Sequence, residues 1–403
     1  MMFLRAGVLL YFVLFATSLA ADTTALLPPQ LEEYRNEGME ALFNMNYEAA
    51  RASFQKMIDS EPNHPAGYVY MSNTIWLGHL AAIRRLQTNI YNRGNSFFSK
   101  TEDTVDPQVD QAFRRQIAKG IVLSENRLKT KKDDISSLYY QGIARNILAG
   151  YEATVKRSFL PALRNGSKGV ALHKEILKKD PNCIDAQLSV GMYNYVVGSL
   201  PFAVKVLAFI GGVRGSKKDG IAMLEKVSKE GNYAREEGKV LLVMLYNREK
   251  RVDDALKTLN DLVYRYPGNS LFRLERAMTL GQLKKYNEST KEFETMLQDP
   301  VASNYIPDLI HYQYATMLAD ANQWDPSYEH YVAALRSPKA PAPLVTLAHL
   351  NAGKALDMLK KRDEAIVQYQ LVLKRKDVFD SHDQAKKYLK NSFTTESRSS
   401  RSD

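Results

Sequence analysis

Three stretches of this chain place residues of the same kinds at the same intervals, and this spacing constrains the fold more than any other feature. In each stretch a small residue is followed after 12 positions by a second small residue, after 4 more by an aromatic residue or Leu, and after 8 more by a residue that ends a helix. These intervals predict two antiparallel helices that cross at the small residues. Because such a hairpin buries its apolar face only against its neighbours, the hairpins are expected to stack into an array. The three sets are Gly38, Ala50, Phe54 and Pro62; Val243, Ala255, Leu259 and Pro267; and Gly353, Ala365, Tyr369 and Asp377.

The same pattern predicts where the array begins and ends. A first repeat occupies residues 31–62, and regular repeats occupy 234–377, with steps of 34, 38 and 38 residues between the small residues of successive units. An amphipathic segment at 380–390 is expected to cover the last apolar face. The polar, Ser-rich residues 391–403 are expected to form a disordered tail.

Residues 64–232 keep the residue types of the pattern but stretch its intervals. Gly142 and Gly169 are 27 residues apart, and Gly191 and Gly220 are 29 apart. A similar expansion is expected at 72–118. We therefore expect three elongated hairpins with about 15 to 30 extra residues between their helices, relative to a repeat of about 34 residues. These insertions should emerge on one side of the array, where we expect binding.

The N-terminus has the composition of an export signal. Arg5 is followed by an apolar run from Ala6 to Phe15 and by small residues up to Ala20, which predicts a signal peptide at 1–20. The run is shorter than the ~20 apolar residues that span a membrane. We therefore expect an exported protein, with the periplasm as the favoured compartment and secretion or attachment to the envelope as alternatives.

Composition excludes some classes of site and disfavours others. Cys183 is the only cysteine, so the chain has no intramolecular disulfide, and we interpret Cys183 as a buried or turn residue. The formal net charge is +10, but Lys and Arg are scattered and no basic run exceeds four residues. A solvated basic surface or an anionic partner in the cell envelope is therefore expected, and nucleic-acid binding is not.

The elongated hairpins carry apolar tips. The longest is a run from Val196 to Val213 that contains Phe202 and Phe209 and has Lys205 as its only charge. Pro and Gly residues interrupt it, which argues against a membrane-spanning helix. Two interpretations stay open: the tips complete the core, or they form a hydrophobic groove or membrane-facing patch for a lipid-like ligand or a partner helix. The other tips are Phe97–Phe98 and Phe159–Pro161.

Two similar segments lie beside these tips. The segments 164–169 and 214–220 both combine Arg, Gly, Ser and Lys, and each precedes an apolar helix. Free N–H groups at a helix start attract anions, so Arg164, Lys168, Arg214 and Lys217 are candidates for contact with an acidic headgroup or phosphate. A turn followed by a helix cap is the plainer interpretation.

Tyrosines gather near the first helices of the elongated hairpins. In repeats of this kind the first helices line the concave face, so Tyr139, Tyr140, Tyr193 and Tyr195 are candidates for contact with a peptide partner. Tyrosine is also a normal filler between helices, and that alternative stays open.

Catalytic patterns are sparse. The seven histidines show no metal-ligand spacing, and neither a G-x-S-x-G nor a G-x-G-x-x-G motif occurs. His173 stands where the repeat has an aromatic residue, so a packed ring is the favoured interpretation. No enzymatic activity, metal or cofactor is expected.

With these motifs, the chain resembles tetratricopeptide-repeat proteins over most of residues 31–390. Its centre is similar to eukaryotic members of the inclusion-body-clearance type. The resemblance implies an all-α fold, a right-handed α-solenoid that acts by binding and has no catalytic residues. The residues that carry the central resemblance are Leu200, Pro201, Leu207, Gly211, Gly212, Gly215, Gly220 and Leu224.

Two functions follow from these observations. The first is an exported, non-enzymatic scaffold that binds a protein or peptide partner in its concave groove. The alternative is a carrier or sensor of a hydrophobic, perhaps anionic, lipid-like ligand held by the elongated hairpins, with contact to a membrane surface.

Overall fold

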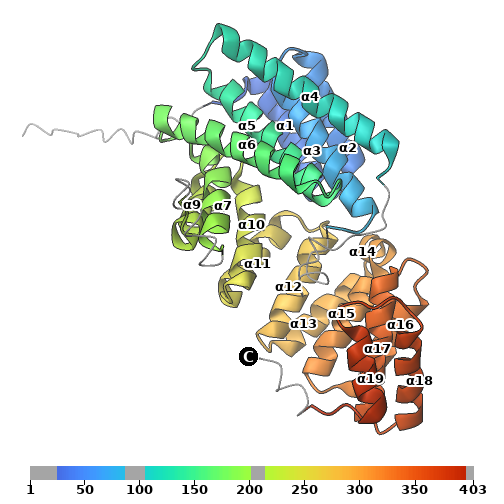
Figure 1. Cartoon of the computed structure of the whole chain (residues 1–403). Helices are drawn as coiled ribbons and strands as arrows, with labels where there is room; N and C mark the ends of the chain where they lie inside the picture. Colours follow the sequence, from blue (N-terminus) through green and yellow to red (C-terminus); the bar gives the residue numbers. More distant parts are fainter. Residues whose placement is uncertain (1–24, 87–104, 201–213, 396–403) are drawn as a thin grey trace, which may run out of the picture.

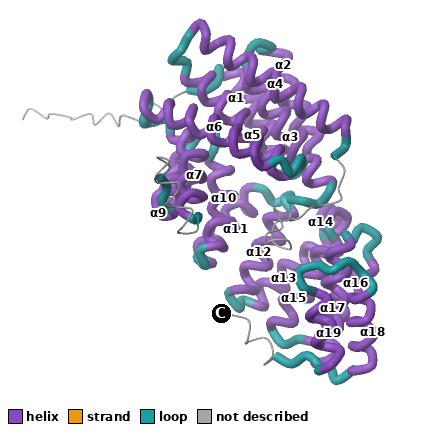
Figure 2. Tube along the Cα trace, viewed as in Figure 1, coloured by secondary structure: helices purple, strands orange, loops and turns teal. Residues whose placement is uncertain are grey.

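The computed structural model describes residues 25–86, 105–200 and 214–395, and within these ranges the chain forms 18 α-helices, one short 3-10 helix and no strand (Figures 1 and 2). The predicted all-α solenoid is confirmed. The helices are α1 (Pro29–Phe43), α2 (Tyr47–Ser60), α3 (Pro65–Ala82), α4 (Pro107–Thr130), α5 (Ile135–Thr154), α6 (Phe159–Lys179), η1 (Ile184–Ala186), α7 (Gln187–Gly198), α9 (Lys217–Glu230), α10 (Arg235–Arg248), α11 (Val252–Arg265), α12 (Ser270–Gln282), α13 (Tyr286–Gln298), α14 (Pro300–Tyr305), α15 (Pro307–Asp320), α16 (Trp324–Arg336), α17 (Ala342–Met358), α18 (Arg362–Leu373) and α19 (Ser381–Lys390).

The helices pack as successive hairpins, each against the next. The pairs are α1–α2, α3–α4, α5–α6, α7–α9, α10–α11, α12–α13, α15–α16 and α17–α18. The short α14 occupies the extra residues that precede α15, and α19 packs on α18 at the position expected for a cap.

The small residue of each signature makes room for the aromatic ring of its partner helix. A Cβ atom on Gly38 would lie 2.6 Å from Cζ of Phe54, and one on Gly353 would lie 2.5 Å from Cε1 of Tyr369. Both rings are fully buried. Glycine at the crossing therefore lets the two helices of a hairpin enclose a large side chain.

Two regular units replace the glycine by a small residue and add a hydrogen bond at the crossing. Ser289 donates through Oγ to the carbonyl of Ala277 at 2.7 Å, and Ser327 donates to the carbonyl of Ala315 at 2.8 Å. Both serines are fully buried. Each bond spans the interval of 12 residues, so the hydroxyl of the second small residue is satisfied by the helix it crosses.

The elongated hairpin α5–α6 gains its length in its helices. α5 has 20 residues and α6 has 21, where α10 and α11 have 14 each. The turn between α5 and α6 is short, and Arg157 holds a positive φ of 56° in it. The expectation that the extra residues emerge as an insertion beside the array is therefore wrong for this hairpin. The other two expected insertions fall largely on residues 87–104 and 201–213, outside the described residues.

The C-terminus is ordered further than expected. Phe393 is 6% exposed, and its ring packs at 5.4 Å from Tyr388 and 6.3 Å from Trp324. Its backbone N–H donates to Oδ2 of Asp357 at 2.7 Å. The predicted disordered tail therefore does not begin at Asn391, because an aromatic side chain near its start joins the core.

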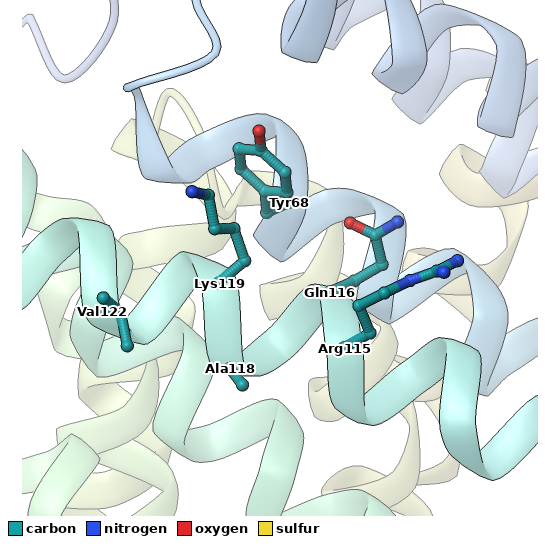
Figure 3. Close-up of a pocket in the computed structure, with 6 residues that line it drawn as sticks. All are labelled: Tyr68, Arg115, Gln116, Ala118, Lys119 and Val122. Carbon is teal, nitrogen blue, oxygen red and sulfur yellow. The ribbon is translucent and has the colours of Figure 1, made fainter.

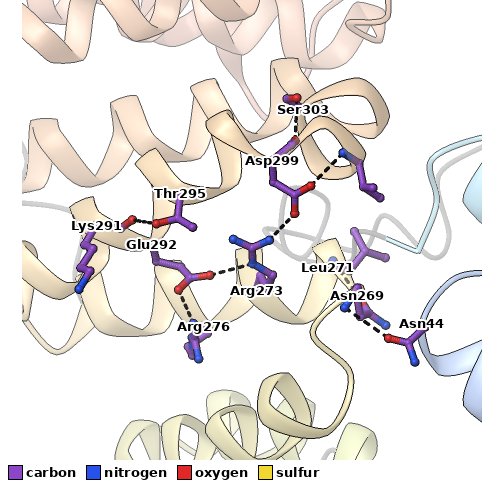
Figure 4. A network of polar contacts seen from close by, with 12 residues as sticks. Asn44, Asn269, Leu271, Arg273, Arg276, Lys291, Glu292, Thr295, Asp299 and Ser303 are labelled. Carbon is purple, nitrogen blue, oxygen red and sulfur yellow. Dashed lines mark hydrogen bonds and ion pairs between the residues drawn. The ribbon is translucent and has the colours of Figure 1, made fainter.

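The first hairpin also contacts units far along the chain, which a stack of nearest neighbours would not do. Asn269, in the α11–α12 connection, donates through Nδ2 to the carbonyl of Phe43 at 2.6 Å. Gly268 donates its N–H to Oδ1 of Asn44 at 3.3 Å, and Asn269 also caps α12 (Figure 4). Phe43 packs on Tyr266 with 4.9 Å between the ring centroids.

A second long-range contact joins the end of α3 to the start of α15. Arg84 donates through Nη1 to Oδ1 of Asp308 at 2.8 Å and to the carbonyl of Lys339 at 2.7 Å. The carboxylate of Asp308 is fully buried. Tyr305 donates to the carbonyl of Ala81 at 3.2 Å. We call the contacts of α1 and α3, with the residues that directly follow them, to residues 233–339 the seam, because they join the first hairpins to units far along the chain.

Candidate functional site

Three of the four candidate tyrosines are core residues. Tyr139, Tyr140 and Tyr195 are 2%, 0% and 1% exposed. Tyr139 stacks on His173, and Tyr195 donates its hydroxyl to Glu249 at 2.7 Å. A ring enclosed by helices cannot contact a partner, so the hypothesis that these three tyrosines form a binding surface is wrong. They fill the space between helices.

Tyr193 is the exception, because it is only half-buried. The Nζ atom of Lys174 lies 4.3 Å from the centroid of its ring, which is a close cation–π contact. Its role in binding stays a prediction.

The two similar segments of the sequence have different structures. Residues 164–169 lie inside α6, where Gly169 packs against α5 and Arg164 and Lys168 are exposed. This segment is therefore neither a turn nor a helix start, and the prediction of a shared anion-binding turn is wrong for it. In the other segment Ser216 caps α9 by accepting a hydrogen bond from the N–H of Asp219 at 3.2 Å.

Lys217 already has a carboxylate partner. Its Nζ atom lies 2.7 Å from Oε1 of Glu249, which also accepts the Tyr195 hydroxyl. The hydrogen bond from Lys217 is the main cause that lowers the pKa of Glu249. Lys217 thus holds a carboxylate of its own chain, while Arg214 is exposed in the segment before α9.

One apolar tip is open to solvent. Phe159, Leu160 and Leu163, at the start of α6, are 40%, 77% and 69% exposed. The interpretation that the tips complete the core does not hold for these side chains. Phe202 and Phe209 lie outside the described residues, so the hydrophobic groove expected there stays a prediction. Within the described ranges, no helix is both long and apolar enough to cross a membrane.

His173 and Cys183 are packed side chains, as the sequence suggested. His173 lies between Oγ of Ser189 at 2.6 Å and the carbonyl of Tyr139 at 3.2 Å, and burial lowers its pKa to about 4. Burial raises the pKa of the Cys183 thiol to about 12, which keeps it protonated and a poor nucleophile. In the described part of the chain, no three His, Cys, Asp or Glu side chains are placed to hold a metal ion.

A buried charge that the repeat pattern did not predict sits at the seam. Arg35 is 8% exposed, donates through Nε to the hydroxyl of Tyr70 at 3.3 Å and donates through Nη2 to the carbonyl of Tyr233. Burial raises the pKa of Glu237 nearby to about 7, and the charge of Arg35 counteracts part of that rise. A signal was present, because Arg35 stands on the apolar face of α1 that Leu31 and Met39 define.

An open groove lies between α3 and α4 (Figure 3). Its volume is about 590 Å³. Val122 contributes an apolar side chain that is 49% exposed, and Tyr68 is held in place by donating its hydroxyl to the carbonyl of Pro62 at 3.1 Å. The lining residues are Tyr68, Arg115, Gln116, Ala118, Lys119 and Val122.

The cations of this groove have no partner among the described residues. Arg115 and Lys119 are exposed and form no hydrogen bond or ion pair there. The carboxylates of the same helix are engaged elsewhere: Asp110 binds Arg114 at 3.1 Å, and Glu125 binds Arg145 at 3.0 Å. The sequence analysis missed this site, although the spacing of 115, 119 and 122 is that of one helix face.

Two arginines of the C-terminal half contrast with the cations of this groove. Arg273 lies 3.1 Å from Oε1 of Glu292 and 2.6 Å from Oδ2 of Asp299, and Arg276 also binds Glu292 (Figure 4). The side chains of Arg273 and Glu292 are 11% and 12% exposed. These cations are neutralised within the fold and are not offered to a partner.

Comparison with known proteins identifies the repeat. The tetratricopeptide repeat family model matches residues 240–269, which span most of α10 and α11. No curated protein matches the sequence. A solved structure of a human IFIT1 dimer with m7Gppp-AAAA is 14% identical, with a TM-score of 0.44 over 91% of this chain and 88% of that one.

Two further solved structures are similar over most of the chain. A tetratricopeptide repeat protein from Parabacteroides merdae is 12% identical, with a TM-score of 0.30 over 80% of this chain and 98% of that one. Yeast Tom70 is 14% identical, with a TM-score of 0.29 over 93% and 97%. These scores carry no inference about ligands. The chain thus contains a tetratricopeptide repeat at residues 240–269 within an array of helical hairpins, and the similarity of its centre to the inclusion-body-clearance type stays a prediction.

Proposed function

We propose that this tetratricopeptide-repeat protein is an exported, non-enzymatic scaffold that binds a protein or peptide partner. Binding is the ordinary role of stacked helical repeats, because their extended surfaces contact a partner over many units. The observation that carries the proposal is the α3–α4 groove, where an exposed apolar side chain lies beside two cations that have no partner among the described residues.

The groove replaces the concave tyrosines as the proposed binding surface. Tyr139, Tyr140 and Tyr195 are enclosed, whereas the groove residues Arg115, Lys119 and Val122 are open to solvent. His173 and Cys183 owe their shifted pKa values mainly to burial in the core.

Export is proposed from the first 20 residues alone. The leader composition and the expected cleavage after Ala20 support it. Leu26 and Leu27, a few residues after the expected cleavage point, are 1% and 5% exposed and pack into the core. N-terminal sequencing of the exported protein should begin at residue 21, and a sequence beginning at Met1 would contradict the leader.

The binding proposal is tested by crosslinking in intact cells. A C-terminally tagged full chain is crosslinked and purified, the captured proteins are identified by mass spectrometry, and the capture is repeated with the tag on the identified partner. Reciprocal capture of one protein supports the scaffold. Recovery of the bare chain alone would contradict it. Native mass spectrometry showing a co-purifying lipid in place of a protein would favour the carrier, the alternative that the exposed Leu160 and Leu163 suggest.

A further inference from the structure

We propose that the α3–α4 groove binds an acidic segment of the partner protein, with an apolar residue of that segment against Val122. This inference rests on the proposed scaffold function and names the chemistry of its partner. Arg115 and Lys119 supply two positive charges without a partner among the described residues, and Gln116 adds an amide that can bond to a peptide backbone. A carboxylate-bearing segment would neutralise both cations at once.

The spacing of the two cations matches an extended peptide. Residues four apart on a helix are separated by about 6 Å along its axis. Alternate residues of an extended chain are separated by about 6.6 Å and point to the same side. Two acidic residues with one residue between them therefore face Arg115 and Lys119. The next residue on that side of the peptide reaches Val122, one turn further along α4.

The local charges leave the groove positive. Asp110 and Glu125, the carboxylates of α4 within reach of its exposed face, are bound to Arg114 and Arg145. One negative charge from another helix lies near the groove. Asp59, on α2, is close enough to Tyr68 to add to the rise in the pKa of the Tyr68 hydroxyl that burial causes. The negative charge of Asp59 would repel an acidic residue placed next to Tyr68. We therefore expect the acidic residues of the bound segment to lie along α4, away from Tyr68.

An acidic peptide fits this groove better than a nucleic acid. A strand of nucleic acid binds through a row of phosphate contacts that track its backbone. Among the described residues, only two cations without a partner line the groove, and they share it with Val122, Ala118 and Tyr68. Two ion pairs beside a half-exposed apolar side chain suit a short peptide with mixed acidic and apolar residues.

The test measures binding of a defined probe to the full chain. The probe is a fluorescein-labelled peptide in which the block Glu-Ser-Glu-Ser-Leu is repeated three times, and its control has Lys in place of every Glu. Fluorescence anisotropy should show binding of the acidic peptide that weakens as NaCl is raised. The double variant R115E/K119E should bind it at least tenfold more weakly, because two attractions become repulsions. Val122→Ser should bind it a few-fold more weakly.

A matched control makes the same charge change elsewhere. Lys386 and Lys390 are also four residues apart, exposed and without an ion pair among the described residues, but they lie on α19. K386E/K390E should bind the probe as the natural chain does. Circular dichroism should show the same helical signal for all variants, and R115Q/K119Q replaces the charge reversal if that variant does not fold.

Three results would overturn the inference. The first is that the natural chain fails to bind the acidic peptide. The second is that the two double variants lose binding equally. The third is that the peptide fails to bind while a single-stranded 20-nucleotide DNA binds and R115E/K119E abolishes that binding. The proposed function is judged separately by reciprocal capture. If R115E/K119E still captures the same partner as the natural chain, the acidic groove fails while the scaffold stands.

Discussion

In regular and elongated hairpins the two helices cross at the same position of the repeat pattern, but different residues meet there. In two of the regular units, α1–α2 and α17–α18, a glycine faces a ring, as Gly353 faces Tyr369. In the elongated hairpin α7–α9 a glycine faces a glycine, and a Cβ atom on Gly220 would lie 2.6 Å from the carbonyl oxygen of Gly191. The stretched interval therefore keeps the crossing of the two helices and brings their backbones closer together.

The two regions also differ in how they use charge. In the regular half, Arg273 and Arg276 bind Glu292 within the fold. The elongated hairpin α3–α4 leaves Arg115 and Lys119 without a partner in the described structure. In these examples the charges of the regular units stabilise the array, whereas the elongated hairpin α3–α4 presents charges to solvent.

The two regions contact each other at the seam. Removing an ion pair of the seam is expected to give the largest change in the free energy of unfolding. Asp308→Ala leaves the guanidinium of Arg84, whose side chain is only 13% exposed, without its carboxylate. Removing one partner of a buried pair costs about 3–5 kcal/mol of the free energy of unfolding. The midpoint of urea unfolding, followed by circular dichroism, should fall clearly.

The control for this variant is an exposed pair of the same seam. Arg265 and Glu40 are 56% and 39% exposed, so Arg265→Ala should change the free energy of unfolding by less than about 1 kcal/mol. Equal effects of the two substitutions would show that burial at Asp308 does not hold the two regions together.

A smaller effect separates the two kinds of crossing. Gly220→Ala drives a Cβ atom against backbone atoms of Gly191 and Tyr195, so α7 and α9 must move apart, at a cost of about 2–3 kcal/mol. At Gly353→Ala the nearest atoms belong to the ring edge of Tyr369 and not to the backbone, and alanine favours a helix by about 1 kcal/mol over glycine, which offsets part of the cost. Thermal unfolding should show a larger drop of the midpoint for Gly220→Ala. The reverse order would contradict the closer backbone contact.

Contacts within one hairpin could be predicted from the sequence, whereas helix lengths and contacts between distant hairpins could not. The crossing of Gly38 with Phe54 follows from an interval inside a single unit, so it could be predicted. The interval from Gly142 to Gly169 counts residues between two crossing points. It does not say whether they extend the helices or form a loop, and here they extend the helices.

The candidate site was harder to predict for two physical reasons. A tyrosine such as Tyr140 suits an interior and a binding face equally well, and only the packed neighbours decide. The pair of Arg84 and Asp308 lies 224 residues apart in the chain, so it depends on the curvature of the whole array. The groove beside Arg115 depends on which carboxylates of other helices reach α4, and no local pattern contains that information.

The smallest of the expected effects is a change with pH at the seam. Burial is the main cause that raises the pKa of Glu237 to about 7 from its usual 4.5, with Asp185 and Glu236 adding to the rise and Arg35 opposing it. A carboxyl whose pKa is higher in the folded state binds its proton more tightly there. Its contribution to stability is complete below about pH 4.5 and is lost as the pH rises through about 7.

Glu237→Gln removes this dependence. Between pH 6 and 8.5 the natural chain should lose about 1–2 kcal/mol of unfolding free energy relative to the variant, less than a full shift implies because the side chain is partly exposed. Urea midpoints of both proteins at several pH values measure the difference. Buried histidines such as His173 titrate below this window and are common to both proteins, so they cancel. Parallel curves for the two proteins would show that the pKa of Glu237 is not raised in the folded state, as expected if water reaches its carboxyl group.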